Sequence, residues 1–458
     1  RVRRGSWRLK AGRDERKLKT MAELYDWQKP LADRAEKALR GRGFDVLATC
    51  TGSGKSFIAA EVARRLGRPV LVICPKAAKT QFTRCIQAMG AGDLLLDVLN
   101  PSKLIVSRKQ KWYNPSSGWA VPEGTLVIFD EIHRGCSGRE SKATVACALL
   151  KAYGASLLAM SATAACTPLQ MRALAYWAGV APFEMRGFMR WCRANGVYDI
   201  QRPTRYGIKK VPVFTKNRRR AAEIMRGIRA SFGDAFQSLG PDEIPGFPDE
   251  VLETLYIDLD AGDRKAVDEA YAEMSARMKS DCGDSLAQTT RERERVEFTL
   301  ARPLAEKAAA DAEDGISPVV FFNFTEPRLR FEAGLRELGC AAIASIHGNQ
   351  KEDERQDMID AFNRNALTVA SVNIAAGGAA LSLHDVLRER QRVSYIIPSF
   401  NAADVKQALG RIRRVGGTAV VQRFVIAAGT LMERVGAALD GKLGNIDALN
   451  DSDLCPGK

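Results

Sequence analysis

A glycine-rich octapeptide at residues 49–56 limits the fold of this chain more than any other feature. It reads Thr-Cys-Thr-Gly-Ser-Gly-Lys-Ser and lies between a predicted strand at residues 44–49 and a predicted helix at residues 55–66. In such a loop the glycines let backbone N–H groups close around phosphates, and the dipole of the following helix favours their negative charge. The common phosphate-loop pattern has glycine where Thr49 stands, so this loop is a variant of it. The loop predicts a nucleotide-binding α/β domain.

The chemistry of such loops assigns a task to each residue. Lys55 is expected to meet the β- and γ-phosphates of ATP, and the Ser56 hydroxyl to coordinate Mg²⁺. The alternative, a chance glycine-rich turn, does not explain a Lys-Ser pair that directly opens a helix. The predicted nucleotide-binding residues of the loop are Thr51, Gly52, Ser53, Gly54, Lys55 and Ser56.

An acidic pair, Asp130 and Glu131, ends the apolar run at residues 125–129. In a parallel sheet the carboxyl ends of the strands gather at one edge, where ligands bind. Asp130 is therefore predicted to hold Mg²⁺ through water, and Glu131 to orient or deprotonate the attacking water. A solvated turn is the alternative for an acidic pair alone, and the phosphate loop disfavours it. His133 is more simply interpreted as a structural polar contact than as a catalyst.

The net charge supports a polyanionic partner without establishing one. The chain of 458 residues has a formal net charge of +15, and residues 1–20 carry +7 of it, which leaves +8 for the rest. Lysine and arginine neutralise phosphates in nucleic-acid complexes, so a basic chain suits such a partner. A soluble protein that is merely basic remains the alternative.

The cysteines and the apolar runs indicate the cellular compartment in which the protein is expected. Ten cysteines are scattered without a CxxC pair, which predicts free thiols in a reducing compartment and neither a zinc site nor a disulfide framework. No apolar run approaches the roughly 20 residues that a membrane span needs. No signal-peptide pattern opens the sequence. A bacterial or phage-infected cytoplasm is the expected location, and no membrane partner is expected.

At this point the sequence resembles the superfamily-two helicases and translocases, most closely the Swi/Snf-type double-stranded-DNA translocases and phage helicases. Residues 130–133, Asp-Glu-Ile-His, match the DExH box. Leu-Tyr-Asp-Trp-Gln, ending at Gln28, resembles the segment that reads adenine, and an amide can both donate to and accept from the base edge. The alternative for Gln28 is a residue that caps a first helix.

Two further segments of the first half match motifs of this family. The resemblance implies that Pro75 and Lys76, in Val-Ile-Cys-Pro-Lys, contact the nucleic-acid backbone. It also implies that Ser161, Ala162 and Thr163 couple hydrolysis to movement between domains. Small hydroxyl residues there can change hydrogen-bond partners between two states.

The second half carries the remaining motifs in family order. Residues 319–324, Val-Val-Phe-Phe-Asn-Phe, resemble the first strand of the second domain, and residues 346–362 resemble the Swi/Snf-type HG…ER…F stretch. Residues 376–383, Ala-Gly-Gly-Ala-Ala-Leu-Ser-Leu, resemble a segment that places Gly377 and Gly378 at the nucleic acid, although Ala380 stands where glycine is usual.

The last motif, residues 407–416, has the spacing Q-x-x-G-R-x-x-R. The resemblance places Gln407 and Gly410 at ATP, with Arg414 as the arginine finger and Arg411 its neighbour. A guanidinium there neutralises charge that grows on the transferred phosphoryl group. A solvated or nucleic-acid-facing helix end is the alternative, and it is preferred for Arg413, which lies outside the motif.

Alternation of β-branched runs with amphipathic stretches indicates two α/β lobes with parallel sheets. The resemblance makes them two tandem RecA-like domains joined by a connector and a helical insertion. We expect a basic, disordered tail over 1–20, an ATP-binding RecA-like domain over 21–194, a connector over 195–250, a second RecA-like domain over 251–445 with a helical segment over 260–314, and a C-terminal tail over 446–458.

The predicted function is an ATP-dependent nucleic-acid motor that uses ATP and Mg²⁺ to translocate on, or remodel, duplex or branched DNA. DNA is favoured over RNA because residues 346–362 and 407–416 have Swi/Snf-like character. An RNA helicase and an ATP-gated nucleic-acid-binding scaffold are the alternatives, while a small-molecule kinase leaves the second lobe unexplained. A monomer is expected, and a protein partner for targeting is left open.

Overall fold

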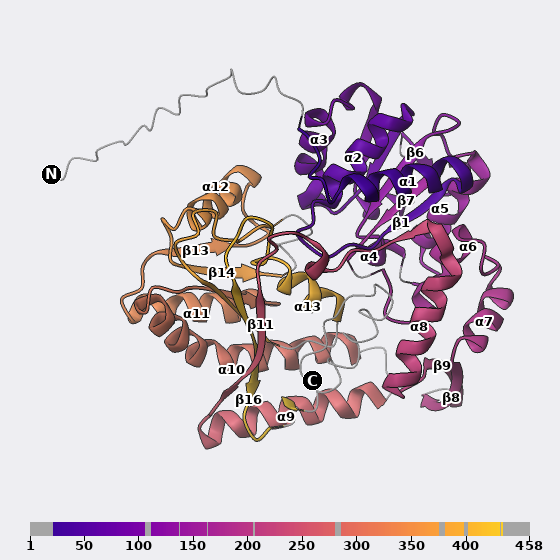
Figure 1. Cartoon of the computed structure of the whole chain (residues 1–458). Helices are drawn as coiled ribbons and strands as arrows, with labels where there is room; N and C mark the ends of the chain where they lie inside the picture. The colour runs from indigo at the N-terminus through magenta and orange to yellow at the C-terminus, as the bar shows by residue number, and fades with distance from the viewer. Residues whose placement is uncertain are drawn as a thin grey trace.

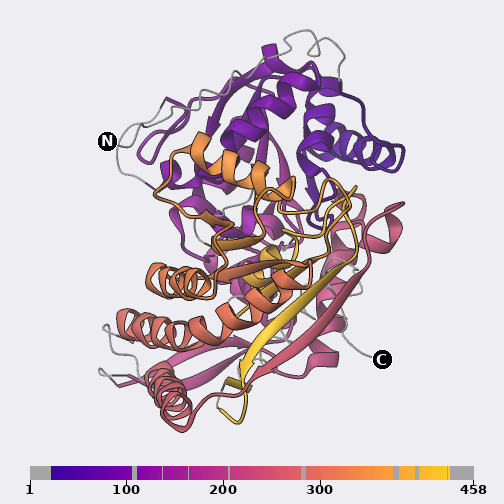
Figure 2. The same cartoon turned by 90° about the vertical axis from the view of Figure 1, so that its left-hand side faces the viewer.

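Two α/β lobes, each built on a six-stranded parallel sheet, form the body of the molecule (Figures 1 and 2). A computed structural model describes residues 22–105, 111–136, 138–162, 164–204, 207–279, 285–374, 381–397, 402–430 and 432–433. The α/β class with two tandem RecA-like lobes, predicted from the sequence, is confirmed. Within the described residues, no helix combines the length and apolar character needed to cross a membrane.

The sheet of the first lobe has the strand order β10-β1-β7-β6-β2-β3. Its strands are β1 (Phe44–Leu47), β2 (Val70–Ile73), β3 (Leu95–Leu99), β6 (Leu126–Asp130), β7 (Ser156–Met160) and β10 (Phe236–Gln237). Neighbouring residues of one strand pack on opposite faces, so Val46 and Leu47 belong to two separate apolar clusters. Every residue of β1, β2, β6 and β7 is buried, as expected for parallel strands covered on both faces.

Helices cover both faces of this sheet. They are α1 (Lys29–Arg42), α2 (Lys55–Leu66), α3 (Lys79–Ala88), α4 (Ile132–Cys136), α5 (Lys142–Leu149), α6 (Arg172–Trp177), α7 (Met185–Ala194) and α8 (Arg218–Phe232), with a short ribbon of β4 (Tyr113–Asn114) and β5 (Gly118–Trp119). Helices α4 and α5 lead from the acidic end of β6 back toward β7.

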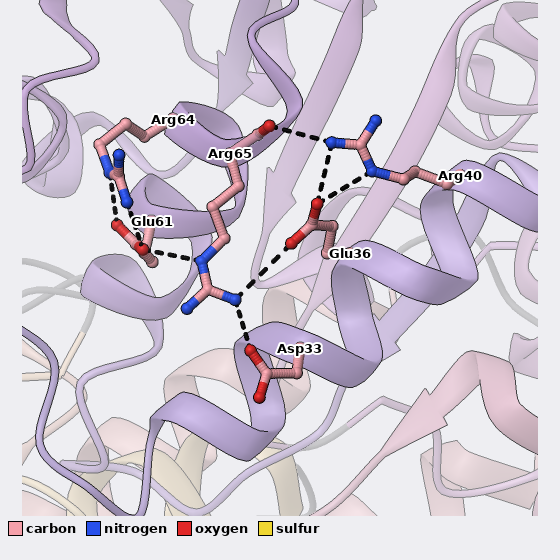
Figure 3. A network of polar contacts seen from close by, with 6 residues as sticks. All are labelled: Asp33, Glu36, Arg40, Glu61, Arg64 and Arg65. Carbon is pink, nitrogen blue, oxygen red and sulfur yellow. Dashed lines mark hydrogen bonds and ion pairs between the residues drawn. The ribbon is translucent and has the colours of Figure 1, made fainter.

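A network of ion pairs ties α1 to α2 (Figure 3). Arg65 of α2 contacts Asp33 and Glu36 of α1, and it also contacts Glu61 one turn earlier in its own helix. Arg40 of α1 donates to the backbone oxygen of Arg65 at 3.0 Å. Ion pairs that solvent still reaches contribute little individually. The pairs fix the position of α1 relative to α2. They thereby help to place Gln28, which precedes α1, relative to Lys55, where α2 begins.

The sheet of the second lobe has the order β11-β16-β15-β12-β14-β13. Its strands are β11 (Glu250–Ile257), β12 (Ser317–Phe322), β13 (Ile343–Ile346), β14 (Val369–Asn373), β15 (Arg392–Ile396) and β16 (Val420–Ala427), and its helices are α9 (Ala261–Lys279), α10 (Ser285–Glu313), α11 (Thr325–Glu337), α12 (Glu352–Asn363) and α13 (Ala402–Leu409). Figure 2 shows β11 and β16 side by side along one edge of this lobe.

The interval predicted as a connector, 195–250, contains regular elements of its own. Strands β8 (Val197–Thr204) and β9 (Gly207–Phe214) form an antiparallel hairpin, and α8 follows. Strand β10 then pairs in parallel with β1, which adds it to the first sheet. The domain boundaries stay predictions, and we propose that the first lobe extends to about residue 240. Strand β10 has only two residues and a distant partner, so it leaves little local pattern in the sequence.

Candidate nucleotide site

The glycine-rich loop joins the end of β1 to the start of α2. Gly52 and Gly54 have φ values of 86° and 75°, a left-handed region that favours glycine. The Lys55 ammonium folds back over the loop and donates to the carbonyl oxygens of Thr49 and Cys50, both at 2.9 Å. The Thr49 hydroxyl bonds the Ser53 hydroxyl at 2.7 Å. The residue that replaces the usual glycine therefore braces the loop from within.

Gln28 reaches the same loop from the chain just before α1. It is 3% exposed, and its Nε2 donates to the Ser53 carbonyl at 2.9 Å while its Oε1 accepts from the Tyr25 N–H at 3.0 Å. A Cβ added to Gly54 would lie 2.5 Å from this Nε2, so glycine is needed for the approach. Gln28 is thus placed at the nucleotide loop, and adenine reading stays a prediction.

The acidic pair lies at the end of β6, between β2 and β7 in the sheet. Glu131 has φ of 50°, an uncommon backbone state for a residue with a side chain. Its carboxylate accepts a 3.3 Å hydrogen bond from Ser161, and His133 Nδ1 lies 2.8 Å from that hydroxyl and 3.3 Å from the carboxylate. Ser161 follows β7 and Ala162 is buried beside it, while Thr163 lies outside the described residues.

Burial sets the proton affinity of the charged groups in this site. Burial and the Glu131 charge together raise the pKa of Asp130 to about 8, although the Lys55 charge acts to lower it. Burial lowers the pKa of Lys55, against the charges of Glu131 and Asp130. The predicted magnesium ligands, the Ser56 hydroxyl and the Asp130 carboxylate, are hard oxygen donors of the kind Mg²⁺ prefers. They fit the ion by chemistry, and a cation there would restore the ionised form of Asp130.

The second lobe brings arginines to the same loop. Arg414 Nη2 donates to the Leu381 carbonyl at 2.8 Å, and Arg411 Nη1 approaches the same oxygen at 3.3 Å. The Arg414 Nε is buried without a hydrogen-bond partner in the described part of the chain. Burial lowers the pKa of Arg414 to about 10, while the Glu131 charge acts to raise it. A buried guanidinium with an open donor suits an anionic ligand.

The two lobes meet closely at glycines. A Cβ on Gly410, after α13, would lie 1.7 Å from the Thr51 hydroxyl oxygen, and one on Gly52 would lie 2.8 Å from Arg414 Cδ. Arg413 points elsewhere, because its guanidinium bonds the Pro248 carbonyl at 2.7 Å and the Glu250 carboxylate at 2.8 Å. Arg413 is therefore a structural contact, neither solvated nor directed at the nucleotide site.

A cavity between the lobes collects nine of the residues predicted to bind or hydrolyse ATP. It holds about 760 Å³ of empty space, part of it open to solvent. Its lining comprises Thr51, Gly52, Gly54, Lys55, Ser56, Phe57, Ala78, Gln81, Phe82, Asp130, Glu131, Ser382, Arg411 and Arg414. We call this cavity the inter-lobe cleft.

Pro75 and Lys76 do not line the cleft, and some other predicted residues lie outside the described part of the chain. Pro75 and the exposed Lys76 lie just after β2, and Gln407 belongs to α13. Gly377 and Gly378 lie outside the described residues. The cleft also adds residues that were not predicted to belong to the site, namely Phe57, Ala78, Gln81, Phe82 and Ser382. Ser382 belongs to the segment 376–383, which the sequence had indicated. No sequence motif points to Gln81 or Phe82.

Comparison with known proteins assigns the class. The family model described as "Type III restriction enzyme, res subunit" matches residues 21–165, the part that holds the phosphate loop and the acidic pair. A putative ATP-dependent RNA helicase of Acanthamoeba polyphaga mimivirus is 26% identical over 483 residues, which cover 95% of this chain and 85% of that protein. These matches indicate a superfamily-two helicase. The matches therefore support the enzyme class of an ATP-dependent helicase, an enzyme that hydrolyses ATP.

Solved structures similar to this helicase include S. cerevisiae Dbp5 bound to RNA and ADP BeF3. That chain matches at 11% identity and a TM-score of 0.47, over 90% of this chain and 87% of its own. A single-residue variant of Dbp5, also bound to RNA and ADP BeF3, matches at 12% identity and a TM-score of 0.48, over 94% and 93%.

One prediction about partners is wrong. The sequence was interpreted as favouring DNA over RNA, but the relative that spans nearly the whole helicase is described as an RNA helicase. The error has a physical basis, since the nucleotide motifs report ATP hydrolysis and are shared by motors on either polymer. The special resemblance to Swi/Snf-type translocases and to the DExH group is not confirmed by the comparisons.

Proposed function

We propose that this protein is an RNA helicase whose two lobes hydrolyse ATP between them in order to move along or remodel RNA. The observation that carries the proposal is the inter-lobe cleft, where Lys55 and Glu131 of the first lobe face Arg414 of the second. The RNA assignment is supported by the relative's description as a putative ATP-dependent RNA helicase.

In the proposed mechanism the first lobe holds the nucleotide. Lys55 exchanges its carbonyl contacts at Thr49 and Cys50 for the phosphates, which are stronger acceptors because they are charged. Ser56 and Asp130 hold Mg²⁺, which when bound supplies charge neutralisation at the β- and γ-phosphates. Glu131 orients the attacking water and accepts its proton.

The second lobe completes the site. Arg414 stabilises charge that develops on the transferred phosphoryl group, and its buried Nε is available for that purpose. Because Arg414 belongs to the other lobe, hydrolysis requires closure of the lobes. This requirement links the chemistry to domain motion.

Coupling to movement runs through the end of β7 in this proposal. Ser161 contacts both Glu131 and His133, so a change at the acidic pair alters the hydrogen bonds of this segment. RNA is proposed to contact the face that bears Pro75 and Lys76 in the first lobe, and Gly377 and Gly378 in the second.

Phosphate release with and without nucleic acid tests the proposal. We expect RNA to raise the turnover rate of ATP hydrolysis several-fold over the rate without nucleic acid, and over the rate with DNA of the same sequence. Stimulation by DNA but not RNA would remove the RNA assignment. Nucleotide binding without any hydrolysis would instead favour an ATP-gated scaffold, which the presence of Lys55, Glu131 and Arg414 disfavours.

A further inference from the structure

The positive charge of the two lobes is concentrated in one segment, Met185–Phe232. This segment contains thirteen lysines and arginines against two acids, Asp199 and Glu223, a net charge of +11. Residues 1–20 carry +7 and this segment carries +11 of the total of +15, so the rest of the chain has a net charge of −3. The segment comprises α7, the β8–β9 hairpin and α8, and we call it the basic module.

The helices of the basic module bury an apolar face and expose a cationic one. Phe188 and Cys192 of α7, and Met225, Ile228 and Phe232 of α8, lie in the core of the first lobe. The exposed cations described in the module are Arg186, Arg190, Arg193, Lys209, Lys210, Lys216, Arg218, Arg219, Arg220 and Arg226. Ordinary protein surfaces mix charges of both signs, and this surface departs strongly from that mixture.

The placement of three of these cations is unfavourable for the helix itself. Arg218, Arg219 and Arg220 form the first turn of α8, which contains no acidic residue. The helix dipole disfavours positive charge at this end, by roughly 0.3–1 kcal/mol for each residue near the terminus. Asn217 caps the helix through the Arg220 N–H at 3.0 Å, so helix formation does not need these arginines. Arg219 contacts Glu223 one turn later at 3.2 Å, and all three arginines are exposed.

The hairpin presents further contact groups. Residues 207–210 of β9 are all exposed, and Lys209 and Lys210 project to opposite faces because neighbouring residues of a strand alternate. Ile208 is 72% exposed and Tyr198 is 44% exposed. Figures 1 and 2 show the hairpin projecting from the first sheet toward the side of the molecule where α9 lies. Aromatic and basic groups together suit the bases and phosphates of a nucleic acid.

We infer that the basic module is a second nucleic-acid-binding surface of this helicase, one that contacts the phosphate backbone of RNA outside the inter-lobe cleft. The inference rests on the proposed function in that RNA is taken as the substrate. Without the module and residues 1–20, the chain carries a net charge of −3 and repels a polyanion at long range. Within the two lobes, the module therefore supplies the attraction for RNA.

The test compares two full-length quadruple variants. The module variant is Lys209→Gln, Lys210→Gln, Arg219→Gln and Arg220→Gln. The control variant removes four exposed cations from other elements, Lys142→Gln, Lys265→Gln, Lys351→Gln and Arg364→Gln. Both lose the same charge, and removing cations from the first turn of α8 favours that helix. Basal ATPase without RNA should stay at the wild-type value in both, which shows that they are folded.

The measurement is the Kd for single-stranded RNA and for duplex RNA at several salt concentrations. The module variant should bind at least about tenfold more weakly than wild type, and its salt slope should fall by about 2–3, since each lost phosphate contact removes roughly 0.7–0.9. The control should stay within about twofold of wild type. A loss for one RNA form alone supports the inference and shows which form the module contacts.

Equal losses in the two variants would overturn the inference, and so would unchanged RNA affinity in the module variant, in which case the surface serves an acidic protein partner. The test of the basic module can fail while the proposed function holds, and the reverse is also true. Wild-type protein that binds RNA through the module, yet shows no RNA-stimulated hydrolysis, contradicts only the proposed function. RNA-stimulated hydrolysis with unchanged affinity in the module variant contradicts only the inference.

Discussion

The Lys55 ammonium lies over the phosphate loop, where it donates to the carbonyl oxygens of Thr49 and Cys50. The position of Lys55 after Gly54 and before an amphipathic run identified the phosphate loop, because that chemistry depends on neighbours in the chain. The carbonyl contacts to Thr49 and Cys50 could not be foreseen in the same way, since they depend on how the loop folds back.

Replacement of Lys55 by alanine should abolish measurable ATP hydrolysis and leave the fold intact. The ammonium is predicted to bind phosphate and stabilise charge, whereas the lysine adds little to the apolar core. Steady-state phosphate release and thermal unfolding measure the two properties. Near wild-type hydrolysis by Lys55→Ala would refute the assignment of this loop.

Asp45 is a buried carboxyl group that the sequence did not single out. It lies in β1 with no exposed surface, and its Oδ1 accepts a 3.3 Å hydrogen bond from Gln237 while its Oδ2 has no partner in the described part of the chain. Burial raises the pKa of Asp45 from 3.8 to about 7. The folded state therefore retains this proton at pH values where the unfolded state has lost it.

The sign of the resulting pH effect follows directly. Below about pH 4 both states hold the proton, and no penalty arises. As the pH rises from about 4 to 7, the unfolded state ionises first, so folding loses on the order of 1.4 kcal/mol per pH unit from this group. Asp45→Asn should remove that loss. Between pH 5 and pH 7, the free energy of unfolding measured with urea should fall by about 2 kcal/mol more in the wild type than in the variant. Equal decreases in the two proteins would contradict the raised pKa of Asp45.

At the scale of elements, long periodic segments were predictable and short or non-local ones were not. The runs that form β1, β6 and β7 are continuous and apolar, and their burial on both faces follows from that pattern. Strand β10 has only two residues and pairs with β1 across nearly 190 positions, so no local pattern could reveal it. The hairpin of β8 and β9 was hidden among arginine, glycine and proline, residues that suggest irregular chain.

The contact between the end of α13 and the phosphate loop gives an element-scale prediction. A Cβ on Gly410 would lie 2.2 Å from Thr51 Cβ as well as 1.7 Å from its hydroxyl oxygen, so Gly410→Ala must push the lobes apart. Displacement by about 1 Å can cost on the order of 10²-fold in rate, and we expect kcat to fall by that order.

A compensating change distinguishes this clash from damage to the helix. Thr51→Gly removes the opposing side chain and should restore part of the kcat in the double variant. Steady-state hydrolysis by the two single variants and the double variant provides the comparison. Wild-type kcat in Gly410→Ala would show that the lobes do not meet here during turnover.

At the scale of the whole molecule, the composite site joins residues nearly 360 positions apart in the sequence. Its two halves were each predictable from motifs, and their meeting in one cleft required the folded arrangement of both lobes. The polymer on which the motor acts was not predictable, because Lys55, Asp130 and Glu131 report ATP chemistry. Recognition of RNA depends on surfaces such as the basic module, whose charge is visible in the sequence only when counted over Met185–Phe232.

Glu131→Gln should trap the closed state of the two lobes. The amide keeps the shape of the side chain but cannot accept the proton of the attacking water, so ATP stays bound and intact. RNA affinity measured with ATP should then exceed that of the wild type under turnover. Equal affinities with and without ATP in this variant would argue against coupling between nucleotide and RNA.

The most direct test of the composite site is single-turnover hydrolysis by Arg414→Ala, with Arg413→Ala as the matched control. Arg413 contacts Pro248 and Glu250 and lies outside the cleft lining. We predict that Arg414→Ala binds ATP almost as well as the wild type but hydrolyses it about 10³-fold more slowly, at the lower end of what arginine fingers contribute. Arg413→Ala should hydrolyse at a rate near that of the wild type. A wild-type rate for Arg414→Ala would contradict the claim that ATP is hydrolysed between the two lobes.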